Sequence, residues 1–192
     1  GDNAGASNTC EIYDPALGTW GGTGSMANAR IEHGWELLPS GKVLIFGGKS
    51  GSQVFSSCEL FDPATGMWSA TGDMSIERYG HASALFANGR VIAIGGNTQL
   101  GIVQNTCELY DPASGAWSGT GNMIDARYRF PAIRLPNNEI LVAGDAGGLS
   151  PTAGKSEIYH SLDGVWTQVG NLQHLVVDGF TLTNLFNGKV LA

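Results

Sequence analysis

The sequence predicts an all-β protein built from four repeats, and three observations support this fold class. A Glu, an aromatic residue, a turn and a Trp recur in the same order at separations of 48 or 49 residues. Two short apolar runs joined by turn residues precede the later recurrences, and no stretch has the period of a long amphipathic helix. Repeats of about fifty residues with all-β content are typical of β-propellers, in which each unit, or blade, buries its faces against its neighbours.

The outer half of each repeat is predicted to be a hairpin that carries the large aromatic residues. Its four copies are Glu11, Tyr13, Asp14, Pro15 and Trp20; Glu59, Phe61, Asp62, Pro63 and Trp68; Glu108, Tyr110, Asp111, Pro112 and Trp117; and Glu157, Tyr159, His160, Ser161 and Trp166. Asp and Pro favour the first positions of a turn, and Gly66 tolerates a positive φ before Trp68. The aromatic side chains are large enough to fill the wedge between adjacent blades, and each buries roughly 150–250 Å² there.

The inner half of each repeat is predicted to be a second hairpin. In the first complete copy, apolar runs at 35–38 and 43–46 flank Pro39, Ser40 and Gly41, which are turn residues between antiparallel strands. Twin glycines follow, where a side chain would clash with a packed neighbour or forbid the backbone angle. Together with the outer hairpin, each repeat therefore supplies four short strands.

The order of residues within one repeat resembles the kelch motif. Arg30 and His33 precede the first hairpin, Gly47 and Gly48 end it, and the block from Glu to Trp completes the unit. The order is particularly similar to that of large bacterial kelch-repeat proteins, and the likeness covers nearly the whole chain. It implies an all-β, kelch-type β-propeller in which four repeats form four-stranded antiparallel blades.

The resemblance also sets the phase of the repeats within a single domain that covers residues 1–192. Complete repeats are expected at 30–68, 78–117 and 127–166, and the fourth is split into 178–192 plus 1–20. Propellers commonly close their ring by completing one blade with strands from both termini, which removes open sheet edges. Three arrangements fit this pattern: a four-bladed ring, two chains that form an eight-bladed ring, and a fragment of a larger ring.

Composition and charge exclude two classes of partner. The chain has a formal net charge of −7, a pI near 4.9 and only ten Lys and Arg residues. It offers no basic stripe for a phosphate backbone, so we expect no nucleic acid partner. No apolar run is long enough to cross a bilayer and no basic cluster is present for anionic lipid, so we expect no membrane insertion. The resemblance implies an extracellular or cell-surface location in a bacterium.

The three cysteines have a structural explanation. Cys10, Cys58 and Cys107 each stand directly before the repeated Glu, so they occupy equivalent positions on different blades. Such positions are expected to be farther apart than the roughly 7 Å limit on the Cα separation of a disulfide. We expect small buried hydrophobes whose thiols do not react in the folded protein.

The repeated cationic residues are also interpreted as structural. Arg30, Arg78 and Arg127 are positions of the kelch consensus, and each guanidinium is expected to tie one blade to the next through carbonyls or the repeated Glu. His33 and His81 share a position at the start of the innermost strand and are expected to be hydrogen-bonded core histidines.

Departures from the repeat indicate where a ligand site would lie, because the scaffold does not require them. In propellers, the loops that enter the inner strand and the loops that follow the second strand share one face, at the mouth of the central channel. The candidate ligand-binding residues on this face are Glu32, Tyr79, Asp125, Tyr128, Arg129, Asp145, His174 and Asp178. Aromatic rings interleaved with carboxylates suit a carbohydrate, whose hydroxyls need acceptors and whose CH faces stack on rings.

These features predict a non-catalytic binding or interaction module that presents its loop face to a protein or carbohydrate ligand. No catalytic residue, metal ligand or cofactor is assigned, because the chain has no nucleophile elbow, phosphate loop or His-x-x-x-His pair. One alternative is a metal-dependent enzyme similar to galactose oxidase, with a site at the channel mouth. Its copper ligands would come from Tyr79, Tyr128, His33, His81 and His174. The other alternative is a structural propeller that assembles into a homodimer or larger ring through the split blade.

Overall fold

The computed structural model describes residues 5–144, 154–173 and 180–192, and within these ranges it contains strands and no helix. Three four-stranded antiparallel sheets follow one another along the chain. Blade 1 consists of β3 (Gly34–Leu37), β4 (Val43–Phe46), β7 (Cys58–Asp62) and β8 (Met67–Ala70). Blade 2 consists of β9 (Ala82–Leu85), β10 (Val91–Ile94), β11 (Cys107–Asp111) and β12 (Ala116–Gly119). Blade 3 consists of β13 (Ala132–Arg134), β14 (Ile140–Ala143), β15 (Ser156–His160) and β16 (Val165–Val169).

Three two-stranded sheets complete the described structure. They are β1 (Glu11–Asp14) with β2 (Thr19–Gly22), β17 (Thr183–Asn184) with β18 (Val190–Leu191), and β5 (Lys49–Ser50) with β6 (Gln53–Val54). The pair β5 and β6 decorates the loop between β4 and β7 of blade 1. The pairs β1–β2 and β17–β18 are the two half-blades expected from the sequence, and we call them the end hairpins.

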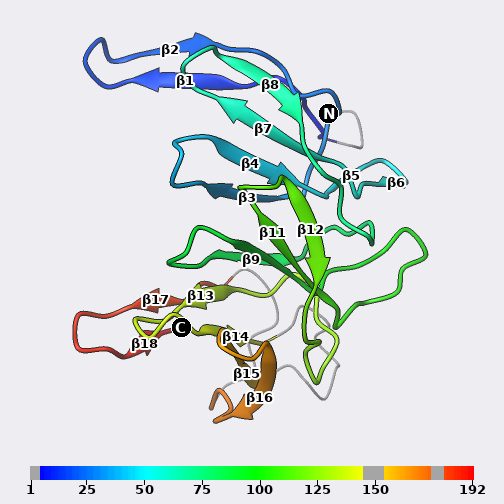
Figure 1. Ribbon diagram of the computed structural model, residues 1–192, viewed down its shortest axis with the longest axis vertical. Coiled ribbons are helices and arrows are strands. Elements are labelled where there is room, and N and C mark those ends of the chain that lie inside the picture. The colour runs from blue at the N-terminus through cyan, green and yellow to red at the C-terminus, as the bar shows by residue number, and fades with distance from the viewer. Residues whose placement is uncertain (1–4, 145–153, 174–179) are drawn as a thin grey trace.

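The blades are arranged side by side in an open arc (Figure 1). Their first strands contact one another in order, β3 with β9 and β9 with β13, so these strands line the inner side of the arc. The end hairpins lie at the two ends of the arc and belong to different sheets. Among the described residues the two end hairpins therefore do not join into one blade, so the four-bladed ring, one of the three arrangements considered, is not closed in this structure.

The recurring aromatic residues pack between blades as predicted. In blades 2 and 3 each Trp is paired across the sheet with a Tyr, as Trp117 is with Tyr110 and Trp166 with Tyr159. The ring centroids of these pairs are 5.2 and 5.3 Å apart. Tyr110 is fully buried and Trp166 is 6% exposed, because the neighbouring blade covers both rings. This burial explains why the largest side chains of the repeat stand on the outer strands.

Two apolar clusters fill the spaces between adjacent blades. Between blades 1 and 2 the buried residues are Leu38, Leu44, Phe46, Cys58, Met74, Val91, Ala93 and Tyr110. The larger cluster between blades 2 and 3 includes Phe86, Ile92, Ile94, Ile140, Val142 and Tyr159. Since both clusters draw on two blades, no blade buries its core alone, which is the defining property of a repeat fold.

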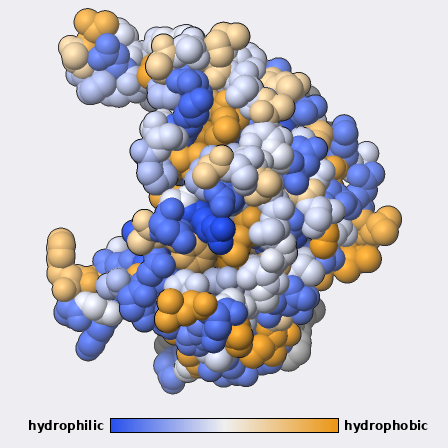
Figure 2. Space-filling model, viewed as in Figure 1, coloured by the Kyte–Doolittle hydropathy of each residue, from blue (hydrophilic) through white to orange (hydrophobic). Residues whose placement is uncertain are grey.

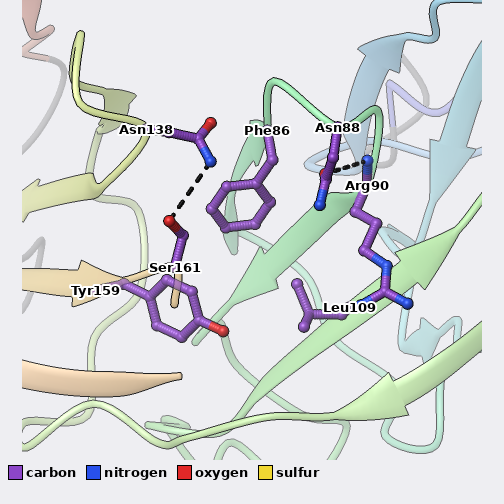
Figure 3. Close-up of a pocket in the computed structure, with 7 residues that line it drawn as sticks. All are labelled: Phe86, Asn88, Arg90, Leu109, Asn138, Tyr159 and Ser161. Carbon is purple, nitrogen blue, oxygen red and sulfur yellow. Dashed lines mark hydrogen bonds between the residues drawn. The ribbon is translucent and has the colours of Figure 1, made fainter. Parts of the chain in front are cut away.

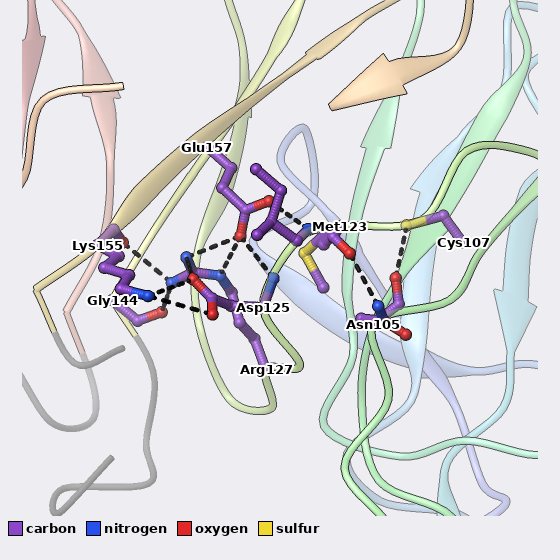
Figure 4. Close-up of polar contacts among 9 residues, drawn as sticks. Asn105, Cys107, Met123, Asp125, Arg127, Gly144, Lys155 and Glu157 are labelled. Atoms are coloured by element: carbon purple, nitrogen blue, oxygen red, sulfur yellow. Dashed lines mark hydrogen bonds and ion pairs between the residues drawn. The ribbon is translucent and has the colours of Figure 1, made fainter. Parts of the chain in front are cut away.

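Each repeated Arg is buried and ties the connector between blades to the blade that follows. The guanidinium of Arg127 donates to the carbonyls of Gly144 at 2.6 Å and Lys155 at 3.0 Å, and to the carboxylate of Glu157 at 2.9 Å (Figure 4). Glu157 also accepts the backbone N–H of Ile124 at 2.6 Å. Arg78 with Glu108 and Arg30 with Glu59 repeat this arrangement. The expected contact between the repeated Arg and the repeated Glu is thus present in all three blades.

The thiols of the two enclosed cysteines are buried as expected. Cys58 and Cys107 are buried in blades 1 and 2. Cys10, directly before β1, is partly exposed, so the prediction of a buried residue is wrong there. All three are free thiols. Desolvation by burial raises the pKa of the Cys58 and Cys107 thiols to about 12 each, so both remain protonated well above neutral pH.

The two repeated histidines are half-buried, and the expected hydrogen bonds are missing at His81. The ring of His81 packs against Phe46 with centroids 5.2 Å apart. Neither of its ring nitrogens has a partner with hydrogen-bond geometry among the described residues, although the Arg78 carbonyl lies nearby. Desolvation lowers the pKa of His81 to about 3 and keeps its imidazole neutral. The prediction of a hydrogen-bonded ring is wrong for His81, because an apolar wall of blade 1 occupies the space where a partner would lie.

Candidate ligand-binding face at the channel mouth

The connectors that enter the inner strands meet the loops that follow the second strands on one face of the arc. After β4, the N–H of Gly48 donates to the carbonyl of Arg78 at 2.8 Å, and after β10 the N–H of Gly96 donates to Arg127 at 2.8 Å. Each bond joins one blade to the connector of the next. These loops therefore form the continuous face that the repeat pattern predicts, and we call it the mouth face.

Three equivalent residues, one from each blade, lie next to one another on the mouth face. Glu32, Gly80 and Arg129 all have left-handed backbone, with φ values of 53°, 59° and 53°. The N–H of Gly80 donates to the Glu32 carbonyl at 2.9 Å, and the N–H of Arg129 donates to the Gly80 carbonyl at 2.6 Å. Left-handed backbone costs roughly 1–2 kcal/mol at a residue other than Gly. Retained strain of this kind is concentrated at functional sites, which directs attention to Glu32 and Arg129.

The carboxylate of Glu32 links the connector of blade 1 to that of blade 3 electrostatically. It accepts two hydrogen bonds from the guanidinium of Arg129, at 2.8 and 3.0 Å, and forms an ion pair with Lys49 Nζ at 3.0 Å. Desolvation alone would raise the pKa of Glu32, but the hydrogen bonds from Arg129 and Lys49 outweigh it and lower that pKa. Glu32 is consequently ionised at neutral pH, and its neighbours are oriented by a fork-shaped contact that fixes both partners.

Two tyrosine rings lie beside these charges. Lys49 Nζ is 4.1 Å from the centroid of the Tyr79 ring, and the Arg129 guanidinium is 5.3 Å from that of Tyr128. The two rings meet edge to face with centroids 6.3 Å apart. The hydroxyl of Tyr79 accepts a hydrogen bond from Asn97 Nδ2 at 3.1 Å. Cation–π contacts of this type are worth about 0.5–1 kcal/mol at exposed sites, so they orient the rings without enclosing them.

The structure brings four of the predicted site residues together and adds two that the sequence analysis missed. Glu32, Tyr79, Tyr128 and Arg129 form one group with Lys49 and Asn97, and we call these six residues the mouth cluster. Lys49 and Asn97 each directly follow the twin glycines of their repeat. This shared position, and not a shared residue type, was the feature of the sequence that could have identified them as site residues.

The other predicted residues do not join the mouth cluster. Asp125 pairs with Lys155 at 3.1 Å and lies 3.8 Å from the guanidinium of Arg127, so it supports the buried Arg127 arrangement (Figure 4). The remaining three, Asp145, His174 and Asp178, lie outside the described residues. Asp125 lies in the connector before β13, where its carboxylate contacts Lys155 and Arg127 and not the mouth cluster.

Four of the five residues named for the metal-dependent alternative lie in the part of the chain that the structure describes. No group of three or more His, Cys, Asp or Glu residues there is placed to hold a metal ion. The ring of His81 is enclosed against Phe46, whereas the Tyr79 hydroxyl is held by Asn97. His174 lies outside the described residues.

Among the described residues, no helix is long and apolar enough to cross a membrane.

A small cavity lies on the opposite face, between blades 2 and 3 (Figure 3). Its lining residues are Phe86, Asn88, Arg90, Leu109, Asn138, Tyr159 and Ser161, and its volume is about 60 Å³. Asn138 spans it, accepting the N–H of Ala87 at 2.8 Å and donating to Ser161 Oγ at 3.4 Å. Arg90 is held by Asp111 at 3.1 Å. This cavity is far below the 300–1,000 Å³ typical of ligand sites. A larger hollow of about 420 Å³ lies on the same face between blades 1 and 2, beside Leu38, Leu60 and Tyr110, so the mouth face is preferred for its cluster of charged and aromatic side chains and not for the size of a cavity.

Comparisons with known proteins agree with the repeat and the fold. The family described as Kelch motif matches residues 39–75, which cover the inner turn, β4, β7 and β8 of blade 1. No curated protein sequence matches the chain. Among 272 matching chains of solved structures is one titled "Structure of YjhT", with a TM-score of 0.76 and 15% sequence identity. That match covers 96% of this chain and 71% of the other. At this identity the likeness establishes the fold alone.

Proposed function

This chain is a kelch-repeat β-propeller, and we propose that it acts as a non-catalytic binding module that presents its mouth face to a protein or carbohydrate ligand. A propeller of this kind supplies a rigid frame, and the residues that differ between repeats supply the specificity. We place the protein outside a bacterial cell or on its surface, in keeping with the resemblance of its repeats to large bacterial kelch proteins.

The convergence of the mouth cluster from three blades is the observation that carries the proposal. The repeat does not require these residues, since the equivalents of Glu32 are Gly80 and Arg129. Holding Glu32 and Arg129 in left-handed backbone is unfavourable, so a stabilising role alone gives a poor account of them. Their exposed charges and the two half-buried tyrosine rings instead offer acceptors, donors and a ring surface within one small area.

A carbohydrate or a peptide would use this surface in similar ways. Sugar hydroxyls bind a carboxylate and a guanidinium through paired hydrogen bonds, while the CH face of the ring covers an aromatic side chain. A peptide would place a charged or amide group against Arg129 and an apolar group against Tyr128. Both ligands make contacts that the small cavity on the opposite face cannot make.

The test is ligand capture by the full chain, with one arm an immobilised glycan panel and the other a displayed peptide library. Affinity for a captured ligand should fall about tenfold or more in Arg129→Ala, as expected when a charged hydrogen-bonding partner of a ligand is removed. Arg90→Ala is the matched control, because Arg90 is a similarly exposed, ion-paired Arg on the opposite face. Absence of a ligand in both arms, or equal affinities of the two variants, would contradict the proposal.

Metal analysis separates this proposal from the enzymatic alternative. The binding module should purify with less than stoichiometric copper and iron and keep its ligand affinity after dialysis against a chelator. A stoichiometric metal whose removal abolishes binding would favour the metal-dependent class instead.

A further inference from the structure

Two hollows of different size lie at equivalent places on the face opposite the mouth. The inner turns of the blades point to one side of the arc, and Figure 2 shows the outline of the molecule hollowed on that side. The cavity between blades 2 and 3 has a volume of about 60 Å³, and the hollow between blades 1 and 2 has about 420 Å³. We call them the filled hollow and the open hollow. Both lie between complete blades, so their difference comes from the residues of those blades.

The turns that border the two hollows have the same backbone structure. In blade 2 the N–H of Gly89 donates to the carbonyl of Phe86 at 3.0 Å, and in blade 3 the N–H of Asn138 donates to the carbonyl of Leu135 at 2.9 Å. Gly89 and Asn138 both have left-handed backbone, with φ values of 83° and 68°. Gly89 therefore occupies at the open hollow the position that Asn138 occupies at the filled hollow.

The first difference between the hollows is an aromatic ring. In the filled hollow, Phe86 packs against Tyr159 with ring centroids 5.8 Å apart. The equivalent of Phe86 in the open hollow is Leu38, which lies beside Tyr110 and has no ring. The two tyrosines are otherwise held alike, because each hydroxyl bonds a Thr hydroxyl of the preceding blade, at 2.8 Å for Tyr110 and 2.7 Å for Tyr159. Tyr110 therefore lacks the ring that covers Tyr159.

The second difference is a polar side chain. Asn138 closes the filled hollow by accepting the N–H of Ala87 and donating to a Ser hydroxyl of blade 3. At the open hollow Gly89 has no side chain, and the equivalents of the two partners are Pro39 and Pro112. Proline has neither a backbone N–H nor a hydroxyl. The side chain that closes the filled hollow and both of its polar partners are thus absent together from the open hollow.

We propose that the open hollow is a second binding site, separate from the mouth face, which takes an aromatic side chain of another polypeptide. The bound ring lies beside Tyr110, as Phe86 lies beside Tyr159 in the filled hollow. The rings of Pro39 and Pro112 contact its edges. An aromatic side chain buries roughly 150–250 Å² in such a place. Aromatic residues that fill desolvated pockets are frequent anchors of protein–protein interfaces.

The polarity of the walls favours a side chain over a sugar. Leu38, Leu60 and the two prolines line the open hollow with apolar atoms, where the many hydroxyls of a carbohydrate would lose their hydrogen bonds to water. Polar side chains stand at the rim, where Ser40 and Asn88 belong to exposed turns. They are placed to bond the backbone of the segment that carries the ring. The volume also lies within the roughly 300–1,000 Å³ typical of ligand sites.

Small amide probes test the preference for a ring. N-acetyl-tryptophanamide, titrated into the full chain, should shift the NMR signals of the Leu38 and Leu60 methyl groups and of the Gly89 amide in a saturable way. N-acetyl-leucinamide should bind about three- to tenfold more weakly, because it has no ring to pack against Tyr110. Equal affinities of the two probes, or shifts confined to the mouth cluster, would overturn the proposal.

Gly89→Asn closes the open hollow with the side chain that this protein already uses at the equivalent turn. A Cβ on Gly89 would lie 3.2 Å from Pro39 Cγ, and Asn138 shows that Asn adopts the required backbone. The variant should weaken binding of the tryptophan probe about tenfold or more. Asn138→Gly is the matched control, since it exchanges the same two residues at the filled hollow, and it should leave that affinity unchanged. An unchanged affinity in Gly89→Asn, or an equal loss in both variants, would contradict the assigned site.

Leu38→Phe tests the same site through a different side chain. It supplies from within the chain the ring that Phe86 supplies to the filled hollow, so it should also weaken binding of the tryptophan probe about tenfold. Thermal unfolding of each variant shows whether it is folded, and the result of either folded variant decides the question. A folded Leu38→Phe chain that binds the probe like the wild type would overturn the proposal.

A displayed peptide library separates this site from the mouth face. Peptides that bind the wild-type chain but not Gly89→Asn should contain Trp, Tyr or Phe, and they should keep their affinity for Arg129→Ala. A library in which every captured peptide depends on Arg129 and none depends on Gly89 would overturn the open hollow as a site. The reverse outcome would count against the mouth face alone, so the two proposals fail independently.

Discussion

The β11–β12 hairpin of blade 2 and the β1–β2 hairpin at the open end have nearly the same sequence but different surroundings. Each pairs a Tyr with a Trp across the strands, with ring centroids 5.2 Å apart in both. Tyr110 is nevertheless fully buried, whereas Tyr13 is 47% exposed. The local sequence is therefore sufficient to form the hairpin and its aromatic pair, while burial depends on the neighbouring blade. The same Tyr therefore contributes buried apolar surface in blade 2 and is half exposed at the open end, according to its position along the arc.

The largest expected contrast comes from removing equivalent tryptophans. Trp166→Ala should lower the free energy of unfolding by about 3–5 kcal/mol, because it removes a buried ring and leaves a cavity beside Tyr159. Trp20→Ala should lower it by less than about 1 kcal/mol, since the ring is mostly exposed in the single chain. Urea unfolding of both variants measures the difference, and equal losses would contradict the comparison.

A smaller contrast is expected from equivalent glycines. A Cβ on Gly72 would collide with the Gly115 carbonyl of the next blade, whereas a Cβ on Gly170 would meet nothing within 4 Å. Gly72→Ala should therefore cost about 1–3 kcal/mol by forcing two backbones apart. Gly170→Ala should change stability by no more than about 0.5 kcal/mol. Thermal unfolding resolves the two outcomes, and a neutral Gly72→Ala would show that the blades are not in close backbone contact.

The smallest effect is a dependence of stability on alkaline pH. Burial raises the pKa of Cys58 and Cys107 from 9.0 to about 12, and it also raises the pKa of Tyr110 and Tyr159. Between the two values the unfolded chain loses thiol protons that the folded chain keeps, so stability should fall as pH rises above about 9. Cys107→Ala should reduce the slope of that fall in urea unfolding from pH 8 to 11. An unchanged slope would contradict burial of this thiol.

Much of the fold was predictable from the sequence because the same pattern of residues recurs in several repeats. The four copies of the aromatic pair predicted the blades, and the three copies of the repeated Arg, each followed by the repeated Glu, predicted the buried ion pairs. The mouth cluster was harder to predict, since its charged positions differ between repeats: Glu32 corresponds to Gly80 and Arg129, and Lys49 corresponds to Asn97. Lys49 was missed because nothing local distinguishes it from a solvent-exposed Lys after a strand. Its role depends on Glu32 and Tyr79, which reach it from the neighbouring connectors.

The failure at His81 has the same physical origin. A polar ring at the start of an inner strand is expected to find a hydrogen-bond partner, because burying an unpaired polar group is unfavourable. The structure instead places Phe46 of the neighbouring blade against that ring. The sequence of one repeat does not predict which side chain of the adjacent repeat will lie against it. Contacts within a blade are therefore more predictable than contacts across the wedge between blades.

Amide hydrogen exchange tests most directly whether neighbouring blades, rather than local sequence, protect each hairpin. Amides of β10 and β11, which are flanked on both sides, should exchange slowest, and those of β1, β2, β17 and β18 should exchange fastest. Equal protection of β1–β2 and β11–β12 would contradict the account, because hairpins of nearly the same sequence would then be equally stable with and without a neighbouring blade.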